Sequence, residues 1–131
     1  MTAETRQAME PRSVTDLARR YFAAYEAKDR SAIDELLTGD FTFISPFDDH
    51  LSRGLYFQKC WPQSERIKSI RIEKIFEHDN QAFVLYELHP FSGPTFRNTE
   101  FMTTERGKIR QVEVFFGLIP PEMLKEMNLK S

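Results

Sequence analysis

The pattern of hydrophobic and polar positions predicts that the chain begins with an amphipathic helix. Ser13, with Asp16 three residues later, resembles a capping box, in which side chains satisfy the first free amides of a helix. Behind it, apolar residues recur at helical spacing: Val14, Leu17, Ala18, Tyr21, Phe22 and Tyr25. This spacing predicts one helix that extends to about Lys28.

A second helix is expected directly after the first, and the pattern then becomes that of a strand. Asp29 or Ser31 can cap this helix, and Gly39 is a favourable position for its end. The period then shortens to two at residues 41–44, which indicates a short strand, apolar on both faces, that Pro46 ends.

Residues 47–51 are expected to form a loop, followed by a third short helix from about Ser52 to Cys60. Trp61-Pro62 should close this helix, because proline disfavours helical geometry in the residue before it. The two-residue alternation that follows predicts four long antiparallel strands. They cover residues 67–77, 82–89, 95–105 and 109–116, with turns at 78–80 and 90–94, a hairpin turn at Arg106-Gly107, and a short closing helix at 122–128.

Helices gathered before strands predict an α+β fold in which N-terminal helices pack on a curved antiparallel sheet. Val112, Val114 and Phe116 share one face of the last strand, whereas Phe115 lies on the other face, with Phe101 similarly placed on the neighbouring strand. Both faces of the sheet therefore carry apolar side chains. We expect a homodimer formed through the outer face, because exposed apolar patches usually mark interfaces.

Composition narrows the class of protein. A length of 131 residues fits one domain, expected over residues 13–131, with residues 1–12 as a polar, disordered leader. A formal net charge of −2, with scattered Lys and Arg, gives no reason to expect a nucleic acid or a membrane as partner. The single cysteine, Cys60, excludes an intramolecular disulfide framework and a multi-cysteine metal site. No export signal or membrane-spanning segment is recognisable, which favours a cytoplasmic location.

Several stretches resemble one superfamily. They are Tyr21-Phe22-Ala23-Ala24-Tyr25, Ala27-Lys28-Asp29, Leu36-Leu37-Thr38-Gly39-Asp40-Phe41, Gly107-Lys108-Ile109-Arg110-Gln111-Val112 and Phe115-Phe116-Gly117. Together with the element order, they resemble the nuclear-transport-factor-2-like superfamily, in particular its SnoaL-like (polyketide-cyclase-like) and ketosteroid-isomerase-like branches. The resemblance covers roughly Val14 to Gly117 and implies a cone-shaped α+β barrel around one apolar pocket. It is good evidence for the fold and poor evidence for the chemistry, because this fold hosts enzymes of several kinds as well as adaptors.

The resemblance also carries a site onto this chain. The isomerases' phenolic donor falls on Tyr21, and their protonated acid donor falls on Glu100, where they have Asp. Their general base, the carboxylate before the proline that ends the first strand, falls on Ser45. A hydroxyl cannot take a proton from carbon at neutral pH unless another base activates it, so we do not expect a standard ketosteroid isomerase. The alternatives are a surface position for Glu100 and a purely structural core position for Tyr21.

Other side chains could transfer protons. Glu87 and His89 share one face of their strand, and the following hairpin is expected to bring Asn98 beside them as an orienting partner. A hairpin tip in solvent is the simpler interpretation of His89. His50, next to Asp48 and Asp49, is a candidate for a titrating residue at the pocket entrance. Because three consecutive side chains do not readily converge on one ion, we expect no metal site there.

The pocket walls are expected to be mainly apolar. The expected lining residues are Phe43, Ser45, Trp61, Asn98, Val112, Val114 and Phe116. Cys60 is expected to be a small buried residue and not a nucleophile. Arg97 with Glu100 does not reproduce the Asp-Arg-Asp set of the epoxide hydrolases that share this fold, and neither a Gly-rich phosphate loop nor a Ser-His-Asp signature is present. We therefore expect a cofactor-free binding protein or enzyme for a small apolar carbonyl- or phenol-like compound, with a dimeric, non-catalytic binding or structural module as the alternative.

Overall fold

The computed structural model describes residues 12–117, which form four helical segments and six strands. The helical segments are α2 (Val14–Ala27), α3 (Arg30–Leu36), α4 (Arg53–Lys59) and the 3₁₀ segment η1 (Trp61–Arg66). The strands are β1 (Leu37–Ser45), β2 (Asp48–Ser52), β3 (Ile67–His78), β4 (Gln81–Pro90), β5 (Phe96–Glu105) and β6 (Lys108–Phe116). The expected leader, apart from Arg12, and the expected closing helix at 122–128 lie outside the described residues.

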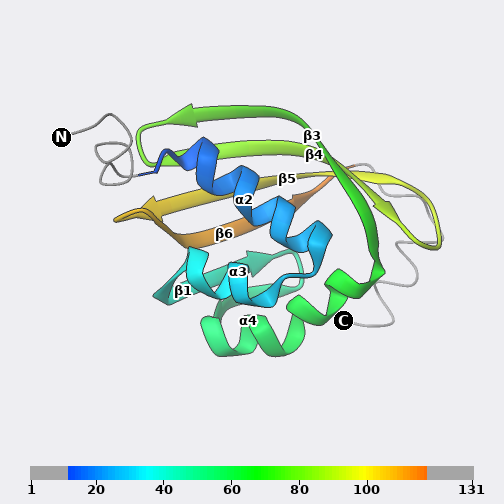
Figure 1. Ribbon diagram of the computed structural model, residues 1–131, viewed down its shortest axis with the longest axis horizontal. Coiled ribbons are helices and arrows are strands. Elements are labelled where there is room, and N and C mark those ends of the chain that lie inside the picture. The colour runs from blue at the N-terminus through cyan, green and yellow to red at the C-terminus, as the bar shows by residue number, and fades with distance from the viewer. Residues whose placement is uncertain (1–11, 118–131) are drawn as a thin grey trace, which may run out of the picture.

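The six strands form one curved, unclosed sheet with the order β2-β1-β6-β5-β4-β3 (Figure 1). All neighbours are antiparallel except β1 and β6, which run parallel. Helix α2 packs on the concave face against β3, β4 and β5, whereas α4 packs against β1 and β2 (Figure 1). The expected α+β fold, with N-terminal helices on a curved sheet, is confirmed. None of the helices within residues 12–117 is long and apolar enough to cross a membrane.

Helix α2 begins and ends where its sequence predicts. The Ser13 hydroxyl accepts a hydrogen bond of 3.0 Å from the Asp16 amide, and Lys28 ends the helix in the left-handed region at φ 58°. Two carboxylates fix the helix on the sheet. Glu77 of β3 accepts hydrogen bonds from the backbone and the hydroxyl of Thr15, and Glu26 accepts one from the amide of Ile70.

Helix α3 is shorter than expected. Asp29 is its cap, accepting a hydrogen bond of 3.1 Å from the Ala32 amide, but the helix ends at Leu36 and not at Gly39. The prediction of its end was wrong because Leu37 already pairs with Ile109 of β6. The parallel pairing with β6 extends the strand backwards through residues that locally suit a helix end.

The loop expected at 47–51 was also wrong, since most of it belongs to strand β2. This strand pairs antiparallel with β1, with Leu51 opposite Phe43 and Ser52 opposite Thr42. Its sequence, Asp48-Asp49-His50-Leu51-Ser52, shows little alternation, so only the pairing with β1 reveals it. Within it, His50 adopts the left-handed conformation at φ 49°.

The core lies between α2 and the concave face of the sheet. Its fully buried members include Leu17, Tyr21, Ile33, Phe41, Tyr56, Val84, Met102, Ile109 and Val112. The opposite face of the sheet carries exposed aromatic side chains: Phe76, Phe83 and Phe115 are 68%, 47% and 46% exposed. Phe83 lies directly opposite Phe101, with ring centroids 4.6 Å apart. The expectation that both faces of the sheet carry apolar side chains is confirmed.

Candidate functional site

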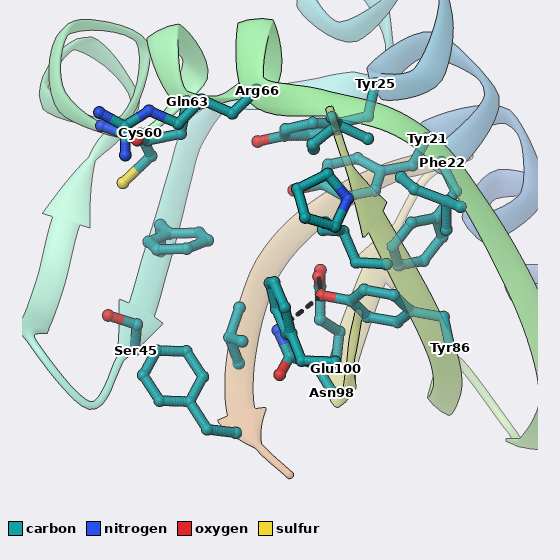
Figure 2. A pocket seen from close by; sticks show the side chains of 18 of the residues that line it. Tyr21, Phe22, Tyr25, Ser45, Cys60, Gln63, Arg66, Tyr86, Asn98 and Glu100 are labelled. Atoms are coloured by element: carbon teal, nitrogen blue, oxygen red, sulfur yellow. Dashed lines mark hydrogen bonds between the residues drawn. The ribbon is translucent and has the colours of Figure 1, made fainter. Parts of the chain in front are cut away.

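A cavity of about 760 Å³ lies between α2, the α4–η1 segment and the concave face of the sheet. Its wall combines aromatic and aliphatic side chains with a few polar groups. Figure 2 shows two polar groups on different sides: Tyr86, Asn98 and Glu100 on the sheet, and Cys60, Gln63 and Arg66 on the helical segments. A concave, mainly apolar surface with few convergent polar groups is typical of a small-molecule site.

Glu100 is the central polar residue of the sheet wall. It lies on β5 between Val84 of β4 and Val114 of β6, and its side chain points into the cavity, only 6% exposed. Its Oε2 atom accepts a hydrogen bond of 2.5 Å from the Tyr86 hydroxyl, which in turn accepts one of 3.2 Å from Asn98 Nδ2 (Figure 2). The position that the resemblance implied for Glu100, on the inner face, is the observed one.

Burial controls the protonation of Glu100. Because the apolar surroundings disfavour the carboxylate, they raise the pKa of Glu100 from 4.5 to about 7, while the hydrogen bond from Tyr86 works in the opposite direction. A carboxyl group with this pKa is populated in both forms near neutral pH. It can therefore donate a proton to a ligand oxygen or accept one from it.

Two oxygens in this group have no partner within residues 12–117. They are Glu100 Oε1 and Asn98 Oδ1, both buried. An unpaired buried acceptor costs about 1–3 kcal/mol, so a native structure normally supplies a partner in the form of protein, water or ligand. The sheet wall thus offers two unsatisfied hydrogen-bonding atoms, one on the carboxyl group of Glu100 and one on the amide of Asn98.

Three tyrosine hydroxyls form a second polar cluster beside α2. Tyr56 of α4 shares hydrogen bonds with Tyr21, at 3.2 Å between oxygens, and with Tyr25. Burial, the largest cause, raises the pKa values of Tyr21, Tyr25 and Tyr56 above the ordinary tyrosine value, which keeps all three protonated. Three hydroxyl protons supply two hydrogen bonds, so one proton is left over, and Tyr21 and Tyr25 both line the cavity.

The resemblance implied that Tyr21 and Glu100 donate hydrogen bonds to one ligand oxygen. In the structure both residues line the cavity, but the Tyr21 hydroxyl bonds to Tyr56, and Tyr86 is the donor that contacts Glu100. Sequence reasoning missed Tyr86 and Tyr56. Tyr86 could have been found from parity, since Val84, Tyr86 and Leu88 alternate toward the interior, whereas nothing in the helix containing Tyr56 distinguishes it from an ordinary core aromatic.

Ser45 lies at the edge of the cavity, as expected, and has a carboxylate partner. Its hydroxyl donates a hydrogen bond of 2.8 Å to Asp48 Oδ2 and accepts one of 3.1 Å from the Phe47 amide. Asp48 also lines the cavity. Ser45, at the position where the resembling isomerases have their base, is therefore hydrogen-bonded to the carboxylate of Asp48, three residues further along the chain.

The structure excludes His50, Glu87 and His89 from the cavity wall. His50 is exposed and bonds to Asp49 at 2.6 Å. Glu87 and His89 bond to each other at 2.8 Å on the outer face of β4. The expected convergence with Asn98 was wrong, because Asn98 pairs with Tyr86 and points inward, one residue out of phase with Glu87.

Five of the seven expected lining residues line the cavity: Phe43, Ser45, Asn98, Val114 and Phe116. The other two do not. Val112 is fully buried in the core, and Trp61 packs edge-on against Tyr25 with ring centroids 4.9 Å apart. Cys60 does line the cavity, and burial raises the pKa of its thiol to about 12, so it stays protonated and weakly nucleophilic.

Metal-ligating side chains do not cluster in the described part of the chain: residues 12–117 contain no group of three His, Cys, Asp or Glu side chains able to hold an ion. Asp48 faces the cavity, whereas the neighbouring Asp49 and His50 side chains are 96% and 60% exposed. The site therefore consists of a buried carboxyl group, tyrosine hydroxyls and a second carboxylate at the edge.

Comparison with known proteins matches this chain to one family, and the similar solved structures share its fold. The family described as "SnoaL-like domain" matches residues 18–112. A search of curated proteins found no match. Among solved structures, an NTF2-like protein of unknown function from Cytophaga hutchinsonii is similar with a TM-score of 0.69 and 22% identity, over 89% of this chain and 98% of that one.

Two further structures are similar in fold. A proposed SnoaL-like polyketide cyclase from Jannaschia sp. CCS1 has a TM-score of 0.69 and 16% identity, over 90% of this chain and 94% of that one. An LEH-like epoxide hydrolase from M. tuberculosis also has a TM-score of 0.69, with 13% identity over 90% of this chain and 96% of that one. At these identities the likeness establishes the fold and leaves the reaction open.

Proposed function

This chain belongs to the family of SnoaL-like domains, and we propose that it binds a small, largely apolar molecule with a carbonyl or phenol-like oxygen and performs acid/base chemistry on it without a cofactor. The observation that carries the proposal is Glu100, a buried carboxyl group on the wall of a cavity of about 760 Å³. One of its oxygens is held by Tyr86, and the other has no partner within residues 12–117. A ligand oxygen would supply the missing hydrogen-bond partner of the Glu100 carboxyl group.

The proposed chemistry uses the two carboxyl groups in different roles. Glu100 in its protonated form donates a hydrogen bond to the ligand's carbonyl oxygen. Asp48, held by Ser45, accepts a proton from the adjacent carbon. The C–H electron pair becomes the carbon–carbon double bond of an enolate, and the carbonyl π pair moves to the oxygen. Protonated Glu100 stabilises this enolate oxygen through its hydrogen bond, and the proton on Asp48 then returns to carbon. Unlike His50, Glu87 and His89, Asp48 lines the cavity, so it replaces them as the proton acceptor in this proposal.

A thermal-shift screen with apolar carbonyl and hydroxyl compounds tests the proposal. A ligand present at about a hundredfold its dissociation constant adds about 2.7 kcal/mol to the free energy of unfolding. This raises Tm by several degrees in a domain of this size. The shift should be absent in Glu100→Leu and retained in Glu87→Gln, a matched change of a glutamate on the outer face of the sheet. Asp48→Asn should bind the same compound but fail to exchange its α-protons for deuterium, and equal shifts in all variants would refute the role of Glu100.

The second candidate function is a dimeric binding or structural module without catalysis. The exposed phenylalanines of the outer face favour it, because Phe76, Phe83 and Phe115 form an apolar surface that a second copy of the chain would cover. We propose this homodimer together with the ligand-binding function, since the two use opposite faces of the sheet. The absence of a nucleic-acid or membrane partner and a cytoplasmic location stay predictions from composition.

A further inference from the structure

Two positively charged side chains line the cavity on its helical side. Lys59 is the last residue of α4, and Arg66 is the last residue of η1. Figure 2 shows Arg66 with Gln63 and Cys60 on the side of the cavity away from Glu100 and Asn98. Both cations are solvent-exposed, so they stand where the cavity opens to water.

Neither cation has an acidic partner within 4.0 Å in residues 12–117. The cavity wall contains two acidic residues. Glu100 bonds to Tyr86 on the opposite side, and Asp48 already accepts the Ser45 hydroxyl. This contrasts with the outer face, where Arg71 and Arg97 are each paired with glutamates. The opening of the cavity therefore has two unpaired cations.

The rest of the cavity wall is largely apolar. It includes Phe43, Ile70, Leu88, Val114 and Phe116. The cavity thus combines three kinds of lining: neutral or acidic hydrogen-bonding groups on the sheet wall, apolar side chains, and cations on its helical side. A ligand that fits all three has an oxygen function at one end, an apolar body, and a negative charge at the other end.

We propose that the ligand is an amphipathic organic acid whose carboxylate or equivalent anionic group is bound by Arg66 and Lys59 at the opening. This inference rests on the proposed function, and it adds a substrate class to it. The planar guanidinium of Arg66 can bind a carboxylate through two parallel hydrogen bonds, and the Lys59 ammonium adds a second charge. Since both side chains are exposed, their effect on affinity is moderate and sensitive to salt.

Two fluorescent probes with the same apolar body test the inference. 1-Anilinonaphthalene-8-sulfonate carries an anionic group, and N-phenyl-1-naphthylamine is its neutral counterpart. For the double variant Lys59→Gln/Arg66→Gln, we expect the sulfonate probe to bind about fivefold to tenfold more weakly, as for partly exposed charge pairs, and the neutral probe to bind as before. Lys108→Gln, an exposed cation on β6 that does not line the cavity, is the matched control and should change neither affinity. The difference should disappear in roughly 1 M NaCl, where the Debye length is about 3 Å.

The outcomes separate this inference from the proposed function. If each probe binds the double variant as tightly as it binds wild type, the proposed anion site is refuted, while binding of the probes still supports the apolar cavity. If the outer-face variant Phe83→Ser abolishes binding of both probes, they bind the sheet surface, and both the pocket and the anion site are overturned. If the double variant weakens binding of the sulfonate probe only, and both probes still bind Phe83→Ser, the results support both the pocket and the anion site.

Discussion

The hydroxyl of Tyr86 lies 2.5 Å from Oε2 of Glu100, although the two residues are 14 positions apart in the chain. The antiparallel pairing of β4 and β5 brings them together, because Val84 lies opposite Glu100 and Tyr86 opposite Asn98. The two side chains are thus diagonal neighbours on the concave face. This contact fixes the buried carboxyl group in one orientation, with its second oxygen left for a ligand.

Glu100 should make the protein less stable as the pH rises. In the fold its pKa is about 7, against 4.5 in the unfolded chain, so the unfolded chain releases this proton at a lower pH. The free energy of unfolding should fall by roughly 3 kcal/mol between about pH 4.5 and 7 and be constant above that. Urea unfolding at several pH values measures this fall.

Two variants are compared in the pH experiment: one removes the titrating group, and the other is a matched control. Glu100→Gln should lose the decline between pH 4.5 and 7, because its amide does not titrate, while Glu87→Gln on the outer face should retain it. A Glu100→Gln profile that parallels the wild type would show that the carboxyl group is not buried in solution.

Tyr86→Phe should raise the pKa of Glu100 above its wild-type value. The Tyr86 hydroxyl donates to the carboxylate and so favours the charged form, and its removal leaves desolvation without this opposing effect. Carbon-detected NMR titration of the Glu100 carboxyl group measures the change. Tyr21→Phe removes a hydroxyl that bonds to Tyr56 instead, so its effect on the Glu100 pKa should be smaller. A larger effect from Tyr21→Phe would mean that the donor assignment is wrong.

Glu77→Gln should destabilise the protein by about 0.5–1 kcal/mol, the lower part of the range for a lost helix cap, because the contact is exposed. Glu77 accepts hydrogen bonds from the backbone and the side chain of Thr15 in the first turn of α2, where negative charge is also favoured by the helix dipole. The Thr15 side chain, the largest cause, lowers the pKa of Glu77, so this stabilisation is present above the ordinary glutamate pKa and is lost as the pH falls through the lowered value.

Denaturant unfolding at neutral pH and at low pH measures the Glu77 contribution. Glu35→Gln, which changes an exposed glutamate on α3, is the matched control and should leave stability nearly unchanged. If Glu77→Gln and Glu35→Gln behave alike at neutral pH, the contact between β3 and the start of α2 does not contribute to stability.

Phe83→Ser should shift the proposed homodimer toward the monomer. Phe83 is 47% exposed and packs against Phe101 on the outer face, with the two rings tilted by 38°, so a second copy covering this face would bury it. Sedimentation velocity at micromolar concentration measures the change. Phe91→Ser, at a 63% exposed phenylalanine in the β4–β5 connection, is the control and should leave the sedimentation coefficient unchanged. A wild-type protein that sediments as a monomer would refute the dimer.

Much of the fold was predictable because it depends on residues close together in the chain. Ser13 and Asp16 start α2, and alternating side chains define β3 to β6, with Gly107 in the hairpin between the last two strands. These signals are local: a cap needs three residues, and a strand shows its period within five or six. The inward position of Glu100 followed from its parity on β5 and the resemblance, and the structure places it there.

The site was only partly predictable, because it depends on strand register and on helix packing. The sequence grouped Glu87 and His89 with Asn98, but a register with Asn98 opposite Tyr86 sends Glu87 and His89 to the other face. It treated Asp48 as part of a loop, whereas pairing with β1 makes it a strand residue at the cavity edge.

The sequence by itself determined the order of the elements apart from β2, the α+β class, and the parity that places Glu100 on the same face of β5 as Asn98 and Met102. Only the tertiary structure decided that Tyr86 holds Glu100, that Tyr56 joins Tyr21 and Tyr25, and that Lys59 and Arg66 share a cavity with them. The physical reason is how far apart in the chain the interacting residues lie. Hydrophobic periodicity depends on near neighbours and is visible along the chain. These contacts instead join α2, α4, η1, β4 and β5, so they form only when the sheet curves around its core.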